Sequence, residues 1–166
     1  NEFIPTIEHL ESLVDEDTVA ILYNFPSNPT GATITEDQRD ELLSFAQKHD
    51  LWLISDEVYD RIVFDGDHIS FVGCDDERVI LVNSFSKTFA MTGWRIGYAA
   101  GNKEIIKKMK TLQSQSTSCA SSVSQYAAIS ALTQKCEELP KMNAEYKERH
   151  DYVVKELNNI PGVTCR

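Results

Sequence analysis

Between Ser84 and Tyr98 the sequence reads Ser-Phe-Ser-Lys-Thr-Phe-Ala-Met-Thr-Gly-Trp-Arg-Ile-Gly-Tyr. The run places one lysine, Lys87, among small and hydroxyl-bearing residues, with Arg95 eight positions further on. Apolar segments flank it, so we expect the lysine at a strand end, partly desolvated, rather than on a solvated helix face. Such an amine loses its proton at moderate cost and forms a Schiff base with a carbonyl, while a forked guanidinium binds phosphate. The run therefore predicts a nucleophilic amine beside a phosphate site.

The composition fits a globular protein and limits its partners. The chain has 166 residues, 42% of them hydrophobic, and a net charge of −10. This acidity argues against nucleic-acid binding, and no apolar run approaches the roughly 20 residues of a membrane span. The cysteines lack metal-ligand spacing, so we expect no metal site, and reduced thiols suit a cytoplasmic location. They are Cys74, Cys119, Cys136 and Cys165.

Hydrophobic patterning predicts an α/β domain. Thr35 has the pattern of a helix N-cap, with Gln38 at the capping-box position. Strands are expected at 18–23, 51–55, 79–82 and 95–100, the first of them covered on both faces. Helices are expected at 7–14, 36–49, 103–115, 121–135 and 137–158. This order predicts a mostly parallel sheet flanked by helices and ending in a long helix.

Polar clusters follow three of the predicted strands. They lie at 24–31, 56–59 and 84–87. Ligands of parallel α/β sheets bind beyond the carboxyl ends of the strands. We therefore expect these three clusters, far apart in the sequence, to form one site.

The chemistry of these clusters suits pyridoxal 5′-phosphate. This cofactor requires a lysine for the Schiff base and a carboxylate that keeps its pyridine nitrogen protonated. Lys87 and Asp56 are the candidates for these two catalytic roles. Tyr59 lies three residues after Asp56, so a turn places both side chains on one face. Tyr59 and Asn28 are candidate donors to the phenolic oxygen, and Tyr59 is the third candidate catalytic residue.

Hydroxyl and guanidinium groups are the candidates for phosphate binding. Ser84 and Arg95 are expected to hold the phosphate, with Ser86 as a second hydroxyl. Each cluster also has a simpler interpretation. Asp56 can cap a short helix after it, and Asn28 lies in a segment rich in turn-forming residues. The joint placement at three neighbouring strand ends favours the cofactor site.

The same motifs resemble the class I/II aminotransferases, fold-type I enzymes of the aspartate aminotransferase superfamily. They are Tyr23-Asn-Phe-Pro-Ser-Asn-Pro-Thr-Gly31, Ser55-Asp-Glu-Val-Tyr59 and the run from Ser84 to Tyr98. The resemblance implies the fold of the pyridoxal-phosphate-dependent (PLP-dependent) transferases. It also implies transamination between an L-amino acid such as aspartate and a 2-oxo acid. It gives Lys87, Asp56, Tyr59, Asn28, Ser84, Ser86 and Arg95 the roles assigned above.

The resemblance also implies a longer parent protein. Family members are more than twice as long, and they carry a phosphate-binding helix start upstream and a carboxylate-binding arginine downstream. We therefore expect residues 1–136 to be part of the large cofactor-binding domain and 137–166 to lead toward a small domain. The parent is expected to be a homodimer, and this chain alone to bind the cofactor weakly and be inactive.

Two other functions remain open at this point. The same scaffold can support β-elimination or the ring closure of aminocyclopropane-carboxylate synthase, because Lys87, Asp56 and Tyr59 would serve these reactions too. An aminotransferase-like domain can also act as the ligand sensor of a transcription regulator.

Overall fold

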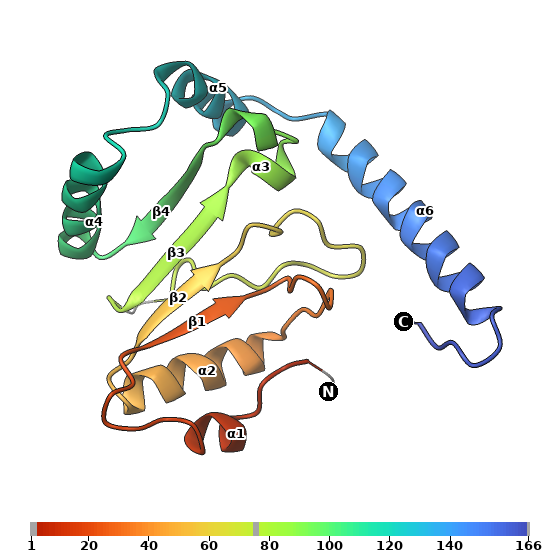
Figure 1. Ribbon diagram of the computed structural model, residues 1–166, viewed down its shortest axis with the longest axis horizontal. Helices are drawn as coiled ribbons and strands as arrows, with labels where there is room; N and C mark the ends of the chain where they lie inside the picture. Colours follow the sequence, from red (N-terminus) through yellow and green to blue (C-terminus); the bar gives the residue numbers. More distant parts are fainter. Residues whose placement is uncertain (1–2, 75–76, 166) are drawn as a thin grey trace.

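A computed structural model of the chain describes residues 3–74 and 77–165. Its centre is a four-stranded sheet in the order β1-β2-β3-β4 (Figure 1). β1, β2 and β3 are parallel, and β4 is antiparallel to β3. The strands are β1 (Ala20–Asn24), β2 (Trp52–Asp56), β3 (Val79–Ser84) and β4 (Gly97–Gly101). The predicted mostly parallel α/β architecture is confirmed, with strand bounds shifted by one or two residues.

The main core lies between the sheet and α2 (Glu36–Lys48), with α1 (Ile7–Glu11) beside it. The predicted capping box is present, because Thr35 and Gln38 each accept a hydrogen bond from the other's backbone N–H. A capped start fixes the face of α2 that meets the sheet. The buried residues of this core include Tyr23, Leu42, Phe45, Ala46, Leu51, Leu53 and Phe71.

A second, smaller cluster supports the end of β3. There the chain forms the short helix α3 (Phe85–Thr88) and the 3₁₀ turn η1 (Thr92–Trp94) before it enters β4. Phe85, Met91 and Ile96 pack with Ala128 of α5 (Ser122–Thr133). α4 (Lys103–Ser116) begins directly after β4, close to its predicted bounds. This cluster holds the segment that carries Lys87 and Arg95.

The first strand differs from its prediction. The side chain of Leu22 is 75% exposed, while that of Tyr23, on the opposite face, is 6% exposed. Its apolar run suggested cover on both faces, but within the described residues α2 covers only the face that carries Tyr23. The run of apolar residues therefore predicted the strand correctly and its surroundings wrongly.

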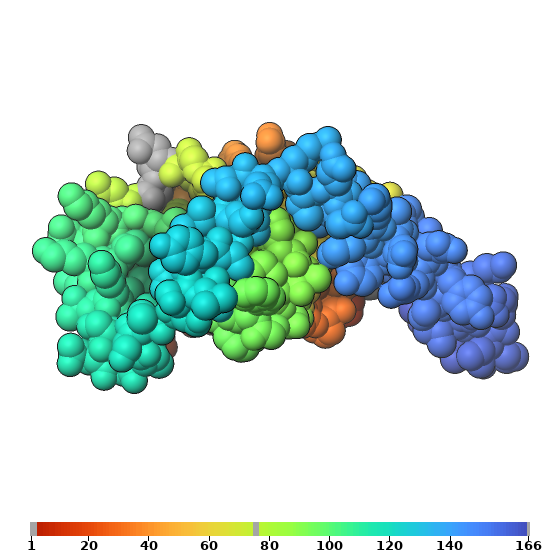
Figure 2. Space-filling view, turned by 90° about the horizontal axis from the view of Figure 1, so that it is seen from above, coloured from red at the N-terminus to blue at the C-terminus, as the bar shows by residue number. Residues whose placement is uncertain are grey.

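The last helix, α6 (Glu138–Asn158), extends away from the sheet (Figures 1 and 2). No residue of α6, all of which the structure describes, is buried. Its contacts with the body include a hydrogen bond of 2.6 Å from Asn143 Nδ2 to the Arg61 carbonyl oxygen. The His150 and Phe64 rings also lie 5.5 Å apart. Of the helices described, none has the length and apolar character needed to cross a membrane.

Candidate active site

The parallel strands bring the predicted polar clusters to one end of the sheet. Asn24 of β1 is in register with Asp56 of β2, which is in register with Val82 of β3. The three strands point the same way, so the segments that follow them emerge at the same edge (Figure 1). The expected meeting of the strand ends is therefore observed.

Asn28 and Tyr59 are brought together from different strands. The turn after β1 closes through a hydrogen bond from the Gly31 amide to the Ser27 carbonyl oxygen, at 2.8 Å. Gly31 has a φ of 72°, a conformation that glycine adopts without strain. This turn aims Asn28 across the sheet edge, where its Nδ2 donates to Tyr59 Oη at 3.2 Å. The segment is a turn, and it also directs a side chain toward the predicted site.

Lys87 lies against the same tyrosine. Its Nζ is 5.5 Å from the centroid of the Tyr59 ring, within range of a cation–π contact. Lys87 is nevertheless exposed. The predicted desolvation of its amine is therefore wrong for this chain, because no described element covers that end of the sheet over Lys87. What the fold supplies is the position of the amine beside Tyr59.

The hydroxyl groups of the predicted phosphate site form one cluster. Ser84 caps α3 by accepting the Ser86 amide at 3.0 Å, and its hydroxyl donates to Ser86 Oγ at 2.9 Å. Ser84 Oγ also lies 3.3 Å from the Ile96 carbonyl oxygen. This contact joins the start of α3 to the residue that follows Arg95.

Arg95 is carried back toward Ser84 by a sharp change of direction. Its φ is 51°, a left-handed conformation unusual for a residue with a side chain. One guanidinium nitrogen donates to the Thr92 carbonyl oxygen at 2.9 Å, and the side chain is exposed. Two residues later, Gly97 is the register partner of Ser84. The fold therefore brings the backbone of the arginine segment to the serine cluster.

Asp56 ends β2 in a half-buried position. Its Oδ1 accepts a hydrogen bond from the Val58 amide at 3.2 Å, so it caps the following segment as considered from the sequence, although that segment is a turn and not a short helix. A carboxylate has two oxygens with several acceptor sites, so this bond leaves capacity for a further partner. Asp56 thus both caps the turn and presents a carboxylate at the strand end.

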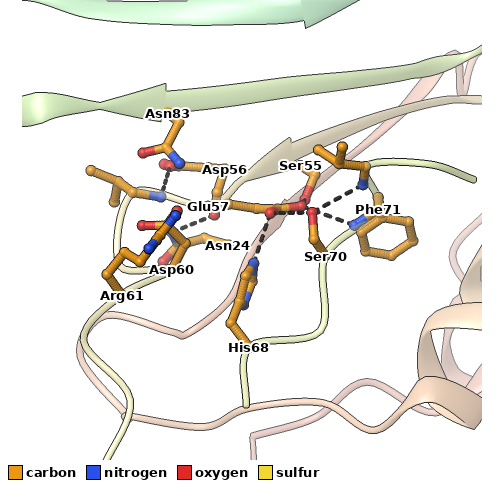
Figure 3. A network of polar contacts seen from close by, with 12 residues as sticks. Asn24, Ser55, Asp56, Glu57, Asp60, Arg61, His68, Ser70, Phe71 and Asn83 are labelled. Carbon is orange, nitrogen blue, oxygen red and sulfur yellow. Dashed lines mark hydrogen bonds and ion pairs between the residues drawn. The ribbon is translucent and has the colours of Figure 1, made fainter. Parts of the chain in front are cut away.

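A buried carboxylate, missed in the sequence, lies next to Asp56. Glu57 is only 3% exposed and ties the segment 68–71 to the end of β2 (Figure 3). Its oxygens contact His68 Nε2 at 2.7 Å, Ser70 Oγ at 2.6 Å, Ser55 Oγ at 2.9 Å and the Phe71 amide at 3.1 Å. The sequence contained an indication that Glu57 is buried. Side chains alternate between the two faces of a strand, so Glu57 lies on the same core-facing side as Leu53 and Ser55.

The surroundings of Glu57 act in two directions on its acidity. Burial raises the pKa of the carboxyl, but hydrogen bonds from His68, Ser70 and the Phe71 amide outweigh it and hold the pKa below its ordinary value. The pKa of the neighbouring Tyr23 is raised by burial and by the negative charge of Glu57. Glu57 is therefore an ionised, internally paired group that fixes the end of β2.

A cleft of about 720 Å³ adjoins the site. Asn28 and Tyr59 form part of its wall, together with Phe64 and His150 of the α6 contact, but Asp56 and Lys87 do not. A larger cavity of about 930 Å³ lies between α1 and α2 and contains none of the predicted site residues. The smaller cleft is thus continuous with the Asn28–Tyr59 part of the strand-end cluster.

Fold and site together define a class of protein, and comparison with known proteins agrees. The sequence profile described as "Aminotransferase class I and II" matches residues 1–166, and the chain belongs to this family. The aspartate aminotransferase of Bacillus subtilis is 40% identical over 99% of this chain. The aromatic-amino-acid aminotransferase 2 of Thermococcus litoralis is 41% identical over 96%. The solved aspartate aminotransferase of Rhizobium meliloti is 41% identical over 96% of this chain, with a TM-score of 0.90.

These relatives are considerably longer than the chain. The matched region covers 43% of the Bacillus subtilis protein, 42% of the Thermococcus litoralis protein and 41% of the Rhizobium meliloti chain. The chain therefore corresponds to less than half of each of these relatives.

Proposed function

We propose that this chain is the part of a pyridoxal-phosphate-dependent aminotransferase that carries the cofactor lysine. The observation that carries the proposal is the contact series Asn28–Tyr59–Lys87, which joins the ends of three strands at 3.2 Å and 5.5 Å. The proposed reaction is transfer of an amino group between an L-amino acid such as aspartate and a 2-oxo acid. The relatives named aspartate and aromatic aminotransferases favour this reaction over elimination or ligand sensing.

The donor set fits pyridoxal phosphate. Tyr59 Oη and Asn28 Nδ2 are already within hydrogen-bond distance of each other, so one phenolic oxygen can receive both donors. Ser84, Ser86 and the guanidinium of Arg95 would bind the phosphate, because clustered hydroxyls and a permanent positive charge suit a dianion. This positive charge is needed locally, since the chain as a whole carries −10.

Asp56 and Lys87 would hold and move protons. When bound, pyridoxal phosphate supplies an electron sink that stabilises negative charge at the substrate Cα. The Asp56 carboxylate would keep the proton on the pyridine nitrogen. The Lys87 amine would bind the cofactor's carbonyl carbon with loss of water. Once the substrate amine has displaced it, the free Lys87 amine would accept the proton from the substrate Cα and deliver it to C4′.

The proposal extends to the protein of which the chain would form part. We assign residues 1–136 to a large cofactor-binding domain and 137–166 to a helix leading toward a small domain. The matched relatives, more than twice as long, support the longer parent protein. We further propose that the parent is a cytoplasmic homodimer.

The test is Lys87→Ala in the full-length protein that contains this chain. Treatment with pyridoxal phosphate and borohydride should label the wild type on one tryptic peptide, that of Lys87. The variant should lose this label and its transaminase activity, because the amine that binds the carbonyl is gone. Lys103→Ala, at the start of α4, is the matched control and should keep both. Undiminished labelling of the Lys87→Ala protein would overturn the proposal.

A further inference from the structure

A second asparagine, Asn24, links the two strand-end segments of the site. It is the last residue of β1 and the register partner of Asp56. Its side-chain Nδ2 donates to the Asp56 carbonyl oxygen at 3.1 Å, and its Oδ1 accepts the Asn28 backbone N–H at 3.1 Å. Figure 3 shows Asn24 lying beside the Asp56 strand end. One half-buried side chain is thus bonded to the backbone of both segments.

The chemistry of the two partners fixes the orientation of this amide. The Asp56 carbonyl oxygen can only accept a hydrogen bond, and the Asn28 N–H can only donate one. Asn24 must therefore present its NH₂ group to Asp56 and its oxygen to Asn28. Aspartate offers no N–H for the first bond, and alanine makes neither bond.

The other hydrogen bonds near Asn28 do not link its segment to the Asp56 backbone. The amides of Ser27 and Gly31 close the turn on itself, with bonds to the Ala32 and Ser27 carbonyl oxygens. The bond from Asn28 Nδ2 to Tyr59 Oη joins two groups that would turn toward the cofactor. The bridge through Asn24 uses neither donor, so it can persist while both are engaged.

We infer that Asn24 is a positioning residue that sets the Asn28 amide donor relative to the carboxylate of Asp56. The inference rests on the proposed function, since it assigns those two residues to one cofactor. Asn24 does not itself touch the cofactor in this scheme. It fixes the distance between Asn28, the proposed donor to the phenolic oxygen, and Asp56, the proposed partner of the pyridine nitrogen.

The experiment compares Asn24→Ala with Asn102→Ala in the full-length protein. Asn102 lies directly after the last residue of β4 and, like Asn24, makes two side-chain hydrogen bonds. It accepts the Glu104 amide at 2.8 Å and donates to Glu77 Oε2 at 3.2 Å. It adjoins Gly101, the partner of Ile80, at the opposite end of β3 from Ser84. The control therefore removes equivalent bonds away from the site.

Asn24→Ser, a smaller perturbation, replaces Asn24→Ala if the latter does not fold.

The first readout needs no cofactor. Hydrogen exchange of the Asn28 amide should quicken at least about tenfold in Asn24→Ala, because its acceptor is removed and the turn opens locally. The same amide should exchange at the wild-type rate in Asn102→Ala. An unchanged Asn28 exchange rate in Asn24→Ala would overturn the inference without affecting the proposed function.

The second readout is the pH midpoint of the absorbance change of bound pyridoxal phosphate. A well-placed donor stabilises the phenolic oxygen most in the deprotonated form of the cofactor, so misplacing Asn28 should raise this midpoint. We expect a shift of about 0.5 to 1 unit in Asn24→Ala, as for the loss of one hydrogen bond, and none in Asn102→Ala. Equal midpoints in all three proteins would overturn the inference alone. If wild type forms no such adduct, the proposed function fails, and the inference fails with it.

Discussion

At the scale of single residues, Asp56 combines two roles that a substitution can separate. Its Oδ1 caps the following turn through the Val58 amide, and its charge is the feature proposed to act on the cofactor. Asparagine has nearly the same shape and keeps an oxygen acceptor, but it carries no charge. Replacement by asparagine therefore tests the charge while leaving the turn in place.

We expect Asp56→Asn to slow Cα proton exchange of a bound amino acid by roughly a hundredfold or more, the scale of losing one preorganised electrostatic contact. The measurement is NMR of α-deuteration in D₂O with the full-length protein. Asp60→Asn is the control, since Asp60 lies in the same turn but accepts from Thr88 Oγ1. Equal exchange rates in wild type and Asp56→Asn would contradict the role of the charge.

The sequence identified residues whose position depends on one strand end, and it missed those that depend on distant partners. Asn28, Asp56 and Lys87 each follow an apolar segment, so their placement at one edge of the sheet is a consequence of parallel strands. The network around Glu57 was not predicted, because His68 and Ser70 lie in a polar stretch without periodicity. The exposure of Lys87 was also missed. Whether a residue at a strand end is buried depends on which other segments pack over it, and the local sequence around Lys87 does not indicate this.

At the scale of elements, the close approach of β4 to β3 depends on two glycines. An added Cβ at Gly97 would lie 2.8 Å from the Asn83 carbonyl oxygen, and one at Gly101 would lie 2.8 Å from that of Val79. Both oxygens belong to the backbone of β3, so the strands must separate to admit a methyl group. Gly97 adjoins the serine cluster, whereas Gly101 lies at the far end of the sheet.

We expect Gly97→Ala and Gly101→Ala each to lower the free energy of unfolding by about 1 to 3 kcal/mol, the usual range for overpacking. In the full-length protein, only Gly97→Ala should also weaken the binding of inorganic phosphate, because it moves Ser84 away from the Arg95 segment. Chemical denaturation and calorimetric titration measure the two effects. Equal loss of phosphate binding in both variants would argue against a local phosphate site.

The sequence predicted most boundaries of the helices and strands, but it did not predict which of their faces are buried by the rest of the chain. The capping box of Thr35 and Gln38 fixed the start of α2, because both hydrogen bonds are local. In the last helix, apolar residues are not buried by the rest of the chain. Tyr146 and Val153 of α6 are exposed. A periodic pattern indicates which face of a helix is apolar, but the partner of that face is decided elsewhere in the chain.

At the scale of the whole molecule, the buried carboxylate of Glu57 links stability to pH. Its pKa is held below the ordinary value in the folded state despite burial. A depressed folded-state pKa contributes stability that is present above the unfolded pKa, about 4.3 for glutamate, and is lost as the pH falls through the folded value. Glu57 thus stabilises the fold at neutral pH and ceases to do so in acid.

We expect Glu57→Gln to lower the free energy of unfolding at pH 7 and to flatten its decline on acidification below about pH 5. Denaturant titrations of this chain across that range provide the measurement. Glu145→Gln is the control, because Glu145 is paired with Arg149 at the surface of α6 and such exposed pairs contribute little. Parallel curves for wild type and Glu57→Gln would show that the network around Glu57 carries no pH-dependent stability.

The reversed direction of β4 also restricts which insertions this family can accept. Because β4 runs antiparallel to β3, the twelve residues between Ser84 and Gly97 return Arg95 to the Ser84 end, whereas a strand parallel to β3 would begin at the opposite end of the sheet. Added residues between Lys87 and Arg95 would alter the connection that holds Arg95 next to the Ser84–Gly97 pair. Length variation among homologues should therefore gather between β2 and β3, outside this short return.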